Sequence, residues 1–165
     1  MIFLLSFFYN FAVSLTWIEP SADLDYHYNQ NQGFQDEIGK TYNRFTPRAQ
    51  GVIRDVVWSL SRNSASISIK FITNSPKIQI QYQREAPFTF PMMNKLGTSG
   101  IDLYGYDEHG GMHFFAGSYN LGNTVTFDFS EHNKSVLFSY LLVLPSYDVV
   151  KPSTLKFGVE DGSFF

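Results

Sequence analysis

Polar and apolar residues alternate along two neighbouring stretches of the chain, residues 66–73 and 77–83. A period of two residues is typical of a half-buried β-strand, because successive side chains point to opposite faces of a sheet. Asn74-Ser75-Pro76, which lies between the two stretches, has the composition of a turn. The pattern predicts a β-hairpin whose aliphatic and aromatic side chains share one face, which a second layer must cover.

Six further stretches have the composition of short strands, and turn-forming residues separate them. They are residues 52–58, 101–106, 112–119, 124–129, 136–143 and 154–159. No stretch after residue 15 keeps a helical apolar stripe over three turns. About eight short antiparallel strands at this spacing predict an all-β domain, a β-sandwich of jelly-roll type. We place this domain at residues 42–165, after a loop-rich lead-in at residues 16–41 that has room for one short strand.

The first fifteen residues are almost wholly apolar. The run is too short to span a bilayer and has the length of the hydrophobic region of a signal peptide. Ala12 and Ser14 are spaced as small residues at a cleavage site are, although no Lys or Arg precedes Lys40. We therefore predict a signal peptide at residues 1–15 and a secreted, periplasmic or cell-surface location. A mis-assigned start codon and a buried first strand are the alternatives.

The composition excludes some classes of partner. Only 16% of the 165 residues are charged and the formal net charge is −3, so no basic stripe is available for a nucleic acid. The chain has no cysteine, and hence no disulfide, which fits a bacterial exported domain with a sufficient core. We expect no membrane span and no cofactor.

Residues able to carry hydrolytic chemistry are present but are not arranged for it. Ser99 follows Gly97-Thr98, which superficially resembles the Gly-Asp-Ser block of SGNH enzymes, yet it precedes a predicted strand where that block would follow one. The chain contains no Asp-x-x-His pair. His109 and His113 flank a Gly-Gly turn near Asp107, where ligand geometry is not fixed, so we predict no metal site.

One acidic residue and several aromatic residues remain as candidates. Asp102 is the one acid embedded in an apolar strand, and we expect a structural carboxylate there, with a buried pair to Arg54 as one alternative. Exposed rings on a sandwich could grip a sugar, although most aromatic side chains must serve the core. The available rings are Trp17, Trp58, Tyr82, Tyr104, Tyr106 and Tyr147.

The order of several motifs resembles one family. Gly100-Ile101-Asp102-Leu103-Tyr104 has the form Gly-x-Asp-Leu-Tyr. The segments 54–65, 92–100, 144–148 and 155–159 also match the family's pattern, so that the likeness extends from Tyr42 to Phe165. The chain is similar to the N-terminal β-sandwich (GxDLY-type) domain of bacterial SGNH hydrolase-type esterases. The signature residues are Gly100, Asp102, Leu103 and Tyr104.

The resemblance implies a longer protein whose two domains have different roles. In the family a flavodoxin-like SGNH (GDSL) domain follows the sandwich and brings the serine nucleophile and the Asp-x-x-His pair, so we expect that domain beyond Phe165. This chain is then a non-catalytic accessory domain of a secreted carboxylic ester hydrolase. It packs against the catalytic domain and helps to position an acylated carbohydrate. The alternatives are a stand-alone carbohydrate-binding module and, with less support, a hydrolase that uses Ser99.

The longest irregular segment after the lead-in is residues 85–99, and long loops on sandwiches often carry function. We expect this loop and the start of the Asp102 strand to form one rim, a surface for substrate or for the neighbouring domain. Its predicted residues are Arg54, Trp58, Met92, Met93, Asn94 and Ser99.

Overall fold

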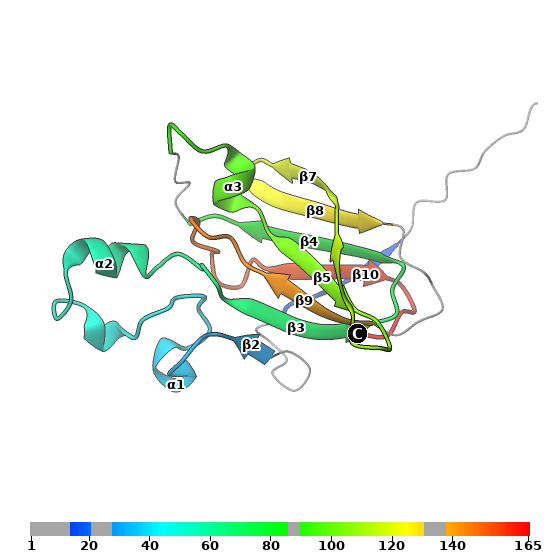
Figure 1. Ribbon diagram of the computed structural model, residues 1–165, viewed down its shortest axis with the longest axis horizontal. Helices are drawn as coiled ribbons and strands as arrows, with labels where there is room; N and C mark the ends of the chain where they lie inside the picture. The colour runs from blue at the N-terminus through cyan, green and yellow to red at the C-terminus, as the bar shows by residue number, and fades with distance from the viewer. Residues whose placement is uncertain (1–13, 21–27, 86–89, 131–137) are drawn as a thin grey trace, which may run out of the picture.

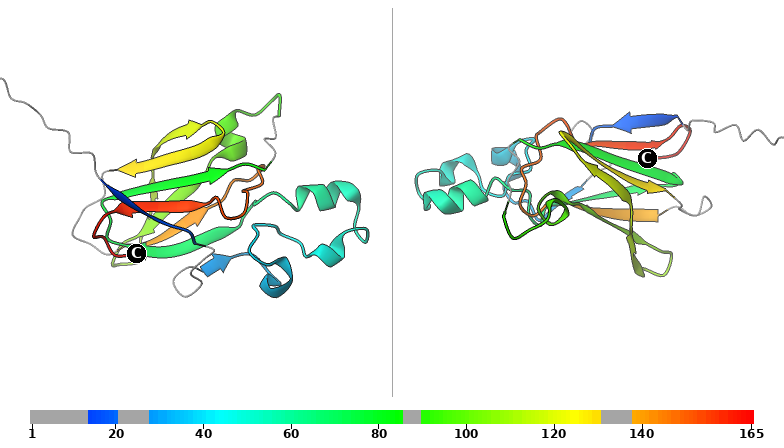
Figure 2. Two further views of the ribbon diagram at one scale, coloured as in Figure 1. Left: turned by 180° about the vertical axis from the view of Figure 1, so that it is seen from behind. Right: turned by 90° about the horizontal axis from the view of Figure 1, so that it is seen from above.

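Ten short strands form two antiparallel sheets in the computed structural model, which describes residues 14–20, 28–85, 90–130 and 138–165. Sheet A has the order β1 (Leu15–Ile18), β10 (Lys156–Glu160), β4 (Lys77–Gln83), β8 (Thr124–Ser130) and β7 (Ser118–Leu121). Sheet B has the order β2 (Tyr28–Gln30), β3 (Ser68–Thr73), β9 (Phe138–Val143), β5 (Asp102–Tyr106) and β6 (Met112–Phe115). The sheets lie one behind the other, with sheet B in front in Figure 1 and sheet A in front in the left view of Figure 2. The predicted β-sandwich is confirmed, with ten described strands instead of about eight.

The core lies between the sheets and follows from the alternation in the sequence. In β4, the side chains of Ile78, Ile80 and Tyr82 are all 0% exposed, whereas the residues between them face outward. Aromatic rings fill the middle of the core. The Phe71 ring stacks on Tyr140 at 5.2 Å between centroids and meets Phe157 edge-on at 4.9 Å. Burial of such rings is the main favourable term holding the two sheets together.

The predicted hairpin is wrong, because β3 and β4 belong to different sheets. Asn74-Ser75-Pro76 carries the chain from sheet B to sheet A. The Ser75 hydroxyl fixes this corner: it donates to the carbonyl of Lys77 (2.5 Å) and accepts from the backbone N–H of Glu160 (2.9 Å). Both strands do present one apolar face, as predicted. Alternation identifies that face but does not say which sheet a strand joins, because both sheets face the same core.

The predicted strand at residues 52–58 is also wrong. Residues 55–60 form the helix α2 (Asp55–Leu60), which follows the 3-10 helix η1 (Pro47–Ala49). Together they make a helical arm, residues 47–60, that projects from one end of the sandwich (Figures 1 and 2). The valines favoured a strand, but β-propensity mainly reflects packing on a sheet, and no strand pairs with this segment.

The stretch 112–119, predicted as one strand, is divided between the sheets. β6 pairs with β5 in sheet B and β7 pairs with β8 in sheet A. Gly117 lies between them, and a Cβ there would come within 2.8 Å of both the Asp128 carbonyl oxygen and the Phe129 ring. The close approach of the two backbones requires glycine at this crossing. The strands predicted at 101–106, 124–129, 136–143 and 154–159 correspond to β5, β8, β9 and β10.

The remaining segments differ from the expectation in detail. The lead-in contributes two short edge strands, β1 and β2, and the helix α1 (Gln35–Ile38). The irregular segment 85–99 contains the one-turn helix α3 (Lys95–Ser99). Residues 1–13, on which most of the predicted signal peptide falls, lie outside the described residues. Within the described residues, no helix has the length and apolar character to cross a membrane.

Candidate functional site at the signature strand

The residues of the signature motif have separate roles. Gly100 ends α3: its N–H donates to the Leu96 carbonyl (2.7 Å), and a Cβ there would collide with that oxygen. Leu103 points into the core and is 0% exposed. Asp102 and Tyr104 point to the outer side of sheet B, where Asp102 is exposed and Tyr104 half-buried. The sequence therefore uses glycine and leucine for folding and presents the acid and the tyrosine on the surface.

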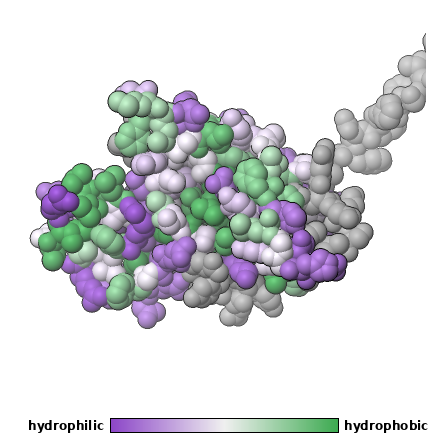
Figure 3. Space-filling model, viewed as in Figure 1, coloured by the Kyte–Doolittle hydropathy of each residue, from purple (hydrophilic) through white to green (hydrophobic). Residues whose placement is uncertain are grey.

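The outer side of sheet B is apolar and aromatic. Tyr104 lies opposite Phe114 of β6 and Leu141 of β9, and its ring meets Phe114 in a T-shaped contact at 5.6 Å. Phe114 remains 59% exposed. We call this surface the aromatic face; its residues are Lys70, Ile72, Tyr104, Tyr106, Met112, Phe114, Ser139 and Leu141. Green residues are visible on this side of the molecule in Figure 3.

The outer side of sheet A has the opposite character. Its outward residues on β4, β8 and β10 are polar or charged, and Lys77 forms an ion pair with Asp128 (3.3 Å). We call this surface the polar face; its residues are Lys77, Gln79, Gln81, Thr124, Thr126, Asp128, Lys156 and Glu160. Trp17 covers Gly158 at its β1 edge. Only one side of the sandwich therefore has the usual solvent-facing composition.

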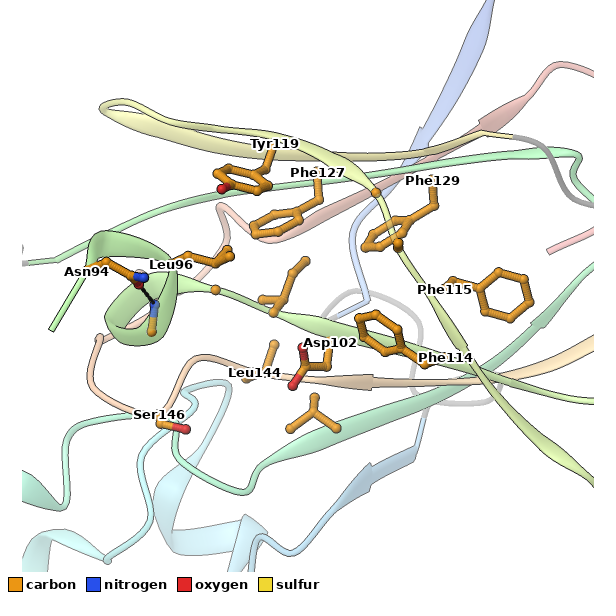
Figure 4. A pocket seen from close by; sticks show the side chains of 16 residues that line it. Asn94, Leu96, Asp102, Phe114, Phe115, Tyr119, Phe127, Phe129, Leu144 and Ser146 are labelled. Carbon is orange, nitrogen blue, oxygen red and sulfur yellow. Dashed lines mark hydrogen bonds between the residues drawn. The ribbon is translucent and has the colours of Figure 1, made fainter.

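A pocket of about 550 Å³ opens where β5 leaves α3, at the Asp102 end of the aromatic face. Figure 4 shows Tyr119, Phe127 and Phe129 on one side and Asp102, Leu144 and Ser146 on the other, with α3 at the end. Aromatic rings beside a carboxylate and a hydroxyl suit a ligand with apolar faces and hydroxyl edges. The volume lies within the usual range for small-molecule sites.

Ser99 is not on this surface, which corrects its place in the predicted rim. Its side chain is 0% exposed, and its hydroxyl contacts Arg84 Nη1 (3.4 Å) and Thr98 Oγ1 (3.3 Å). The Tyr82 hydroxyl donates to the Ser99 carbonyl. Of the described histidines, His113 on β6 lies opposite Gly105, and His109 lies in the turn after β5. The strand rises about 10 Å from Asp102 to Gly105. Ser99 thus lacks the exposure that a nucleophile needs, and neither of the described histidines is placed to act as its base.

Among the described residues, the buried carboxylate is Asp148 and not Asp102. Its side chain is 0% exposed, and neither oxygen has a hydrogen bond of good geometry among the described residues. Arg84 Nε lies 3.7 Å from Asp148 Oδ2. Burial raises the pKa of Asp148, and the neighbouring Ser99 and Arg84 offset only part of that effect. No pattern in the sequence distinguishes this acid, which lies three residues after Pro145. The alternative of a buried pair between Arg54 and Asp102 is wrong, since both residues are exposed.

The other predicted surface residues lie on two separate elements. Arg54 and Trp58 are on the helical arm, where the Arg62 guanidinium stacks over the Trp58 ring at 4.9 Å. Met92 is fully exposed and Met93 partly exposed beside α3. Their roles as substrate or interdomain contacts stay predictions.

Asn94 lies at the pocket and caps α3, accepting from Gly97 N–H with its side-chain oxygen (2.7 Å). It is therefore the member of the predicted rim that lines the pocket.

Asp107 organises the exposed turn that holds the two described histidines. Its Oδ1 accepts from the N–H groups of His109 (2.9 Å) and Gly111 (2.7 Å), and its Oδ2 lies 2.7 Å from His113 Nε2. The hydrogen bond from His113 is the main cause that lowers the pKa of Asp107. No group of three or more candidate metal ligands occurs among the described residues.

A family model described as GxDLY, the N-terminus of SGNH-hydrolase-type esterases, matches residues 15–165. The chain belongs to the GxDLY family. A GDSL-like lipase from Bacteroides ovatus has a similar solved structure, with a TM-score of 0.76 and 24% identity over 92% of this chain. The match spans 42% of that protein's length, and at this identity it supports the fold alone. A search of the curated proteins found no match.

Proposed function

We propose that this domain is the non-catalytic N-terminal accessory domain of a secreted SGNH-type esterase, and that it helps to position an acylated carbohydrate for a catalytic domain that follows it. The observation that carries the proposal is the family match over residues 15–165, because the family is defined as the N-terminal part of such esterases. The burial of Ser99 away from the described histidines supports a non-catalytic role. Export is proposed from the apolar run at residues 1–15.

The pocket beside Asp102 is the place where this domain contacts the substrate. Tyr119 is 53% exposed at its mouth and offers a flat ring to a sugar, and the exposed Asp102 carboxylate offers hydrogen-bond acceptors to its hydroxyls. Neither group touches the ester bond in this proposal. Their contribution is therefore to binding, and it appears in KM.

The test uses the longer protein, in which the catalytic domain follows Phe165, and compares two substrates. Asp102→Asn and Tyr119→Ala raise KM for an acetylated oligosaccharide and leave kcat/KM for p-nitrophenyl acetate unchanged, because the small ester does not reach the pocket. Thr126→Ala on the polar face is the control. Equal effects on both substrates, or none on either, would refute the positioning role.

The second candidate is a stand-alone carbohydrate-binding module, which the aromatic walls of the pocket favour. It predicts that the 165-residue chain binds oligosaccharides by itself and that Tyr119→Ala abolishes binding without unfolding the domain. Calorimetric titration of the isolated chain with acetylated and deacetylated oligosaccharides separates the two candidates. Binding without any esterase activity in the longer protein would favour the module.

A further inference from the structure

The two outer sides of the sandwich differ so much that they cannot have the same environment. A sheet whose outer side faces water normally carries polar residues there, as the polar face does. The aromatic face instead presents Tyr104, Tyr106 and Phe114, with Met112 beside Tyr106 and Ile72 two strands away from Tyr106, across Ser139 of β9. Met112 is 58% exposed and Ile72 is 44% exposed. Exposed apolar patches of this kind mark interaction sites.

The end of the chain is fixed at the corner between β3 and β4. Phe164 N–H donates to Asn74 Oδ1 (2.7 Å), and Thr73 Oγ1 donates to the Phe164 carbonyl (2.5 Å). The Phe165 ring stacks on Phe71 in the core at 5.3 Å. Thr73 directly follows Ile72 of the aromatic face. A domain that continues from Phe165 therefore starts at this corner and is tethered to the sandwich, which gives it a high effective concentration there.

The same corner also lies near the polar face, so composition decides between the two. Association of domains is driven by burial of apolar surface, and aromatic and methionine side chains are enriched in interfaces. The polar face offers ion pairs such as Lys77–Asp128, which gain little from being covered. The helical arm also exposes apolar side chains, among them Val52 and Val56, but it projects from the opposite end of the sandwich from the chain end (Figure 1).

We propose that the aromatic face is the docking surface for the catalytic domain, which packs against its Ile72–Ser139–Tyr106–Met112 row. This inference rests on the proposed function, because it takes the downstream esterase domain as the partner. Docking there leaves the pocket at Asp102 at the edge of the interface, since Asp102 lies at the opposite end of β5 from Tyr106. The pocket then borders the catalytic domain, where it can hold the sugar while the ester enters the active site.

Methionine oxidation by dilute peroxide tests this arrangement, because the chain carries a matched pair of exposed methionines. Met112 is on the aromatic face, and Met92 is fully exposed on the loop before α3. The expected result is that Met112 oxidises several-fold more slowly in the longer protein than in the 165-residue chain, whereas Met92 reacts equally in both. Equal reactivity of Met112 in the two proteins would overturn the proposal.

Charge substitutions give an independent readout. Ile72→Lys restores rapid oxidation of Met112 in the longer protein and lowers its melting temperature, while it leaves the melting temperature of the 165-residue chain unchanged. Thr126→Lys on the polar face is the control, and its effects are the same in both proteins. If Ile72→Lys destabilises both proteins equally, the face is not an interface and the proposal fails.

Two further outcomes separate this inference from the proposed function. If the longer protein has esterase activity but its Met112 is not protected, the accessory role stands and docking on this face is rejected. Protection of Met112 in the 165-residue chain by an added oligosaccharide, without protection by the catalytic domain, would make the face a glycan platform and also reject it. Absence of esterase activity from the longer protein removes the proposed function, and the docking inference with it.

Discussion

Leu103 and Tyr104 are neighbours in the signature motif, yet the structure predicts opposite consequences of truncating them. Leu103 is 0% exposed in the core between the sheets, so Leu103→Ala removes buried methyl groups and leaves a cavity. Such a change lowers the free energy of unfolding by about 2–5 kcal/mol. Tyr104 faces outward, and Tyr104→Ser loses mainly the T-shaped contact with Phe114. That contact contributes about 0.5–1.5 kcal/mol.

Urea unfolding of the 165-residue chain, followed by the fluorescence of Trp17 and Trp58, measures both values. In a domain of this size about 1 kcal/mol shifts the melting temperature by about 2–4 °C, so calorimetry provides a second measurement. We expect the m-value to stay constant, because neither variant changes the surface exposed on unfolding. A loss for Tyr104→Ser as large as that for Leu103→Ala would show that the outer side of sheet B is structural. The aromatic face would then not be a free surface in the isolated domain.

Three further predictions concern buried positions. Gly105→Ala lowers the free energy of unfolding by about 1–3 kcal/mol, because a Cβ there collides with the Phe115 ring, and Phe115→Leu restores part of the loss in urea unfolding. Ser99→Ala leaves kcat of the longer esterase unchanged in a p-nitrophenyl acetate assay, whereas a loss of turnover would reveal a catalytic role. Burial raises the pKa of Asp148 above its ordinary value of 3.8, so the folded state binds this proton more tightly than the unfolded state does. That contribution is complete below about pH 4 and is lost as the pH rises through the folded-state pKa. Unfolding measured from pH 4 to 8 therefore shows a decline in wild type that is smaller in Asp148→Asn, and parallel curves would contradict it.

The alternation in the sequence predicted individual strands well and their pairing poorly. Residues 77–83 are β4 to the residue, because every second side chain there must face the core. The partner of β4 is β10 on one side and β8 on the other, and both come later in the chain. A short turn can join two paired strands of one sheet, which makes a hairpin, or it can join a strand of one sheet to a strand of the other. Here the buried Ser75 side chain fixes a corner between sheets, and no local signal distinguishes the two cases.

The candidate site, like the fold, was predictable from the sequence only in part. The alternation of the signature strand is sufficient to place Leu103 inside. Asp102 was expected to be a structural carboxylate of that strand, and it is exposed instead. The pocket was not predictable, since it depends on the crossing of β6 into β7 at Gly117 and on the short helix α3. Nor was the burial of Asp148, because its neighbour Arg84 is 64 positions away along the chain.

The measurement that tests the account most directly is acetyl-ester hydrolysis by the 165-residue chain beside the longer protein read past Phe165. We predict turnover of p-nitrophenyl acetate above the buffer rate only in the longer protein, since the described histidines do not lie beside Ser99. Turnover by the 165-residue chain itself, lost in Ser99→Ala, would contradict a non-catalytic accessory domain. So would a longer protein that hydrolyses no ester.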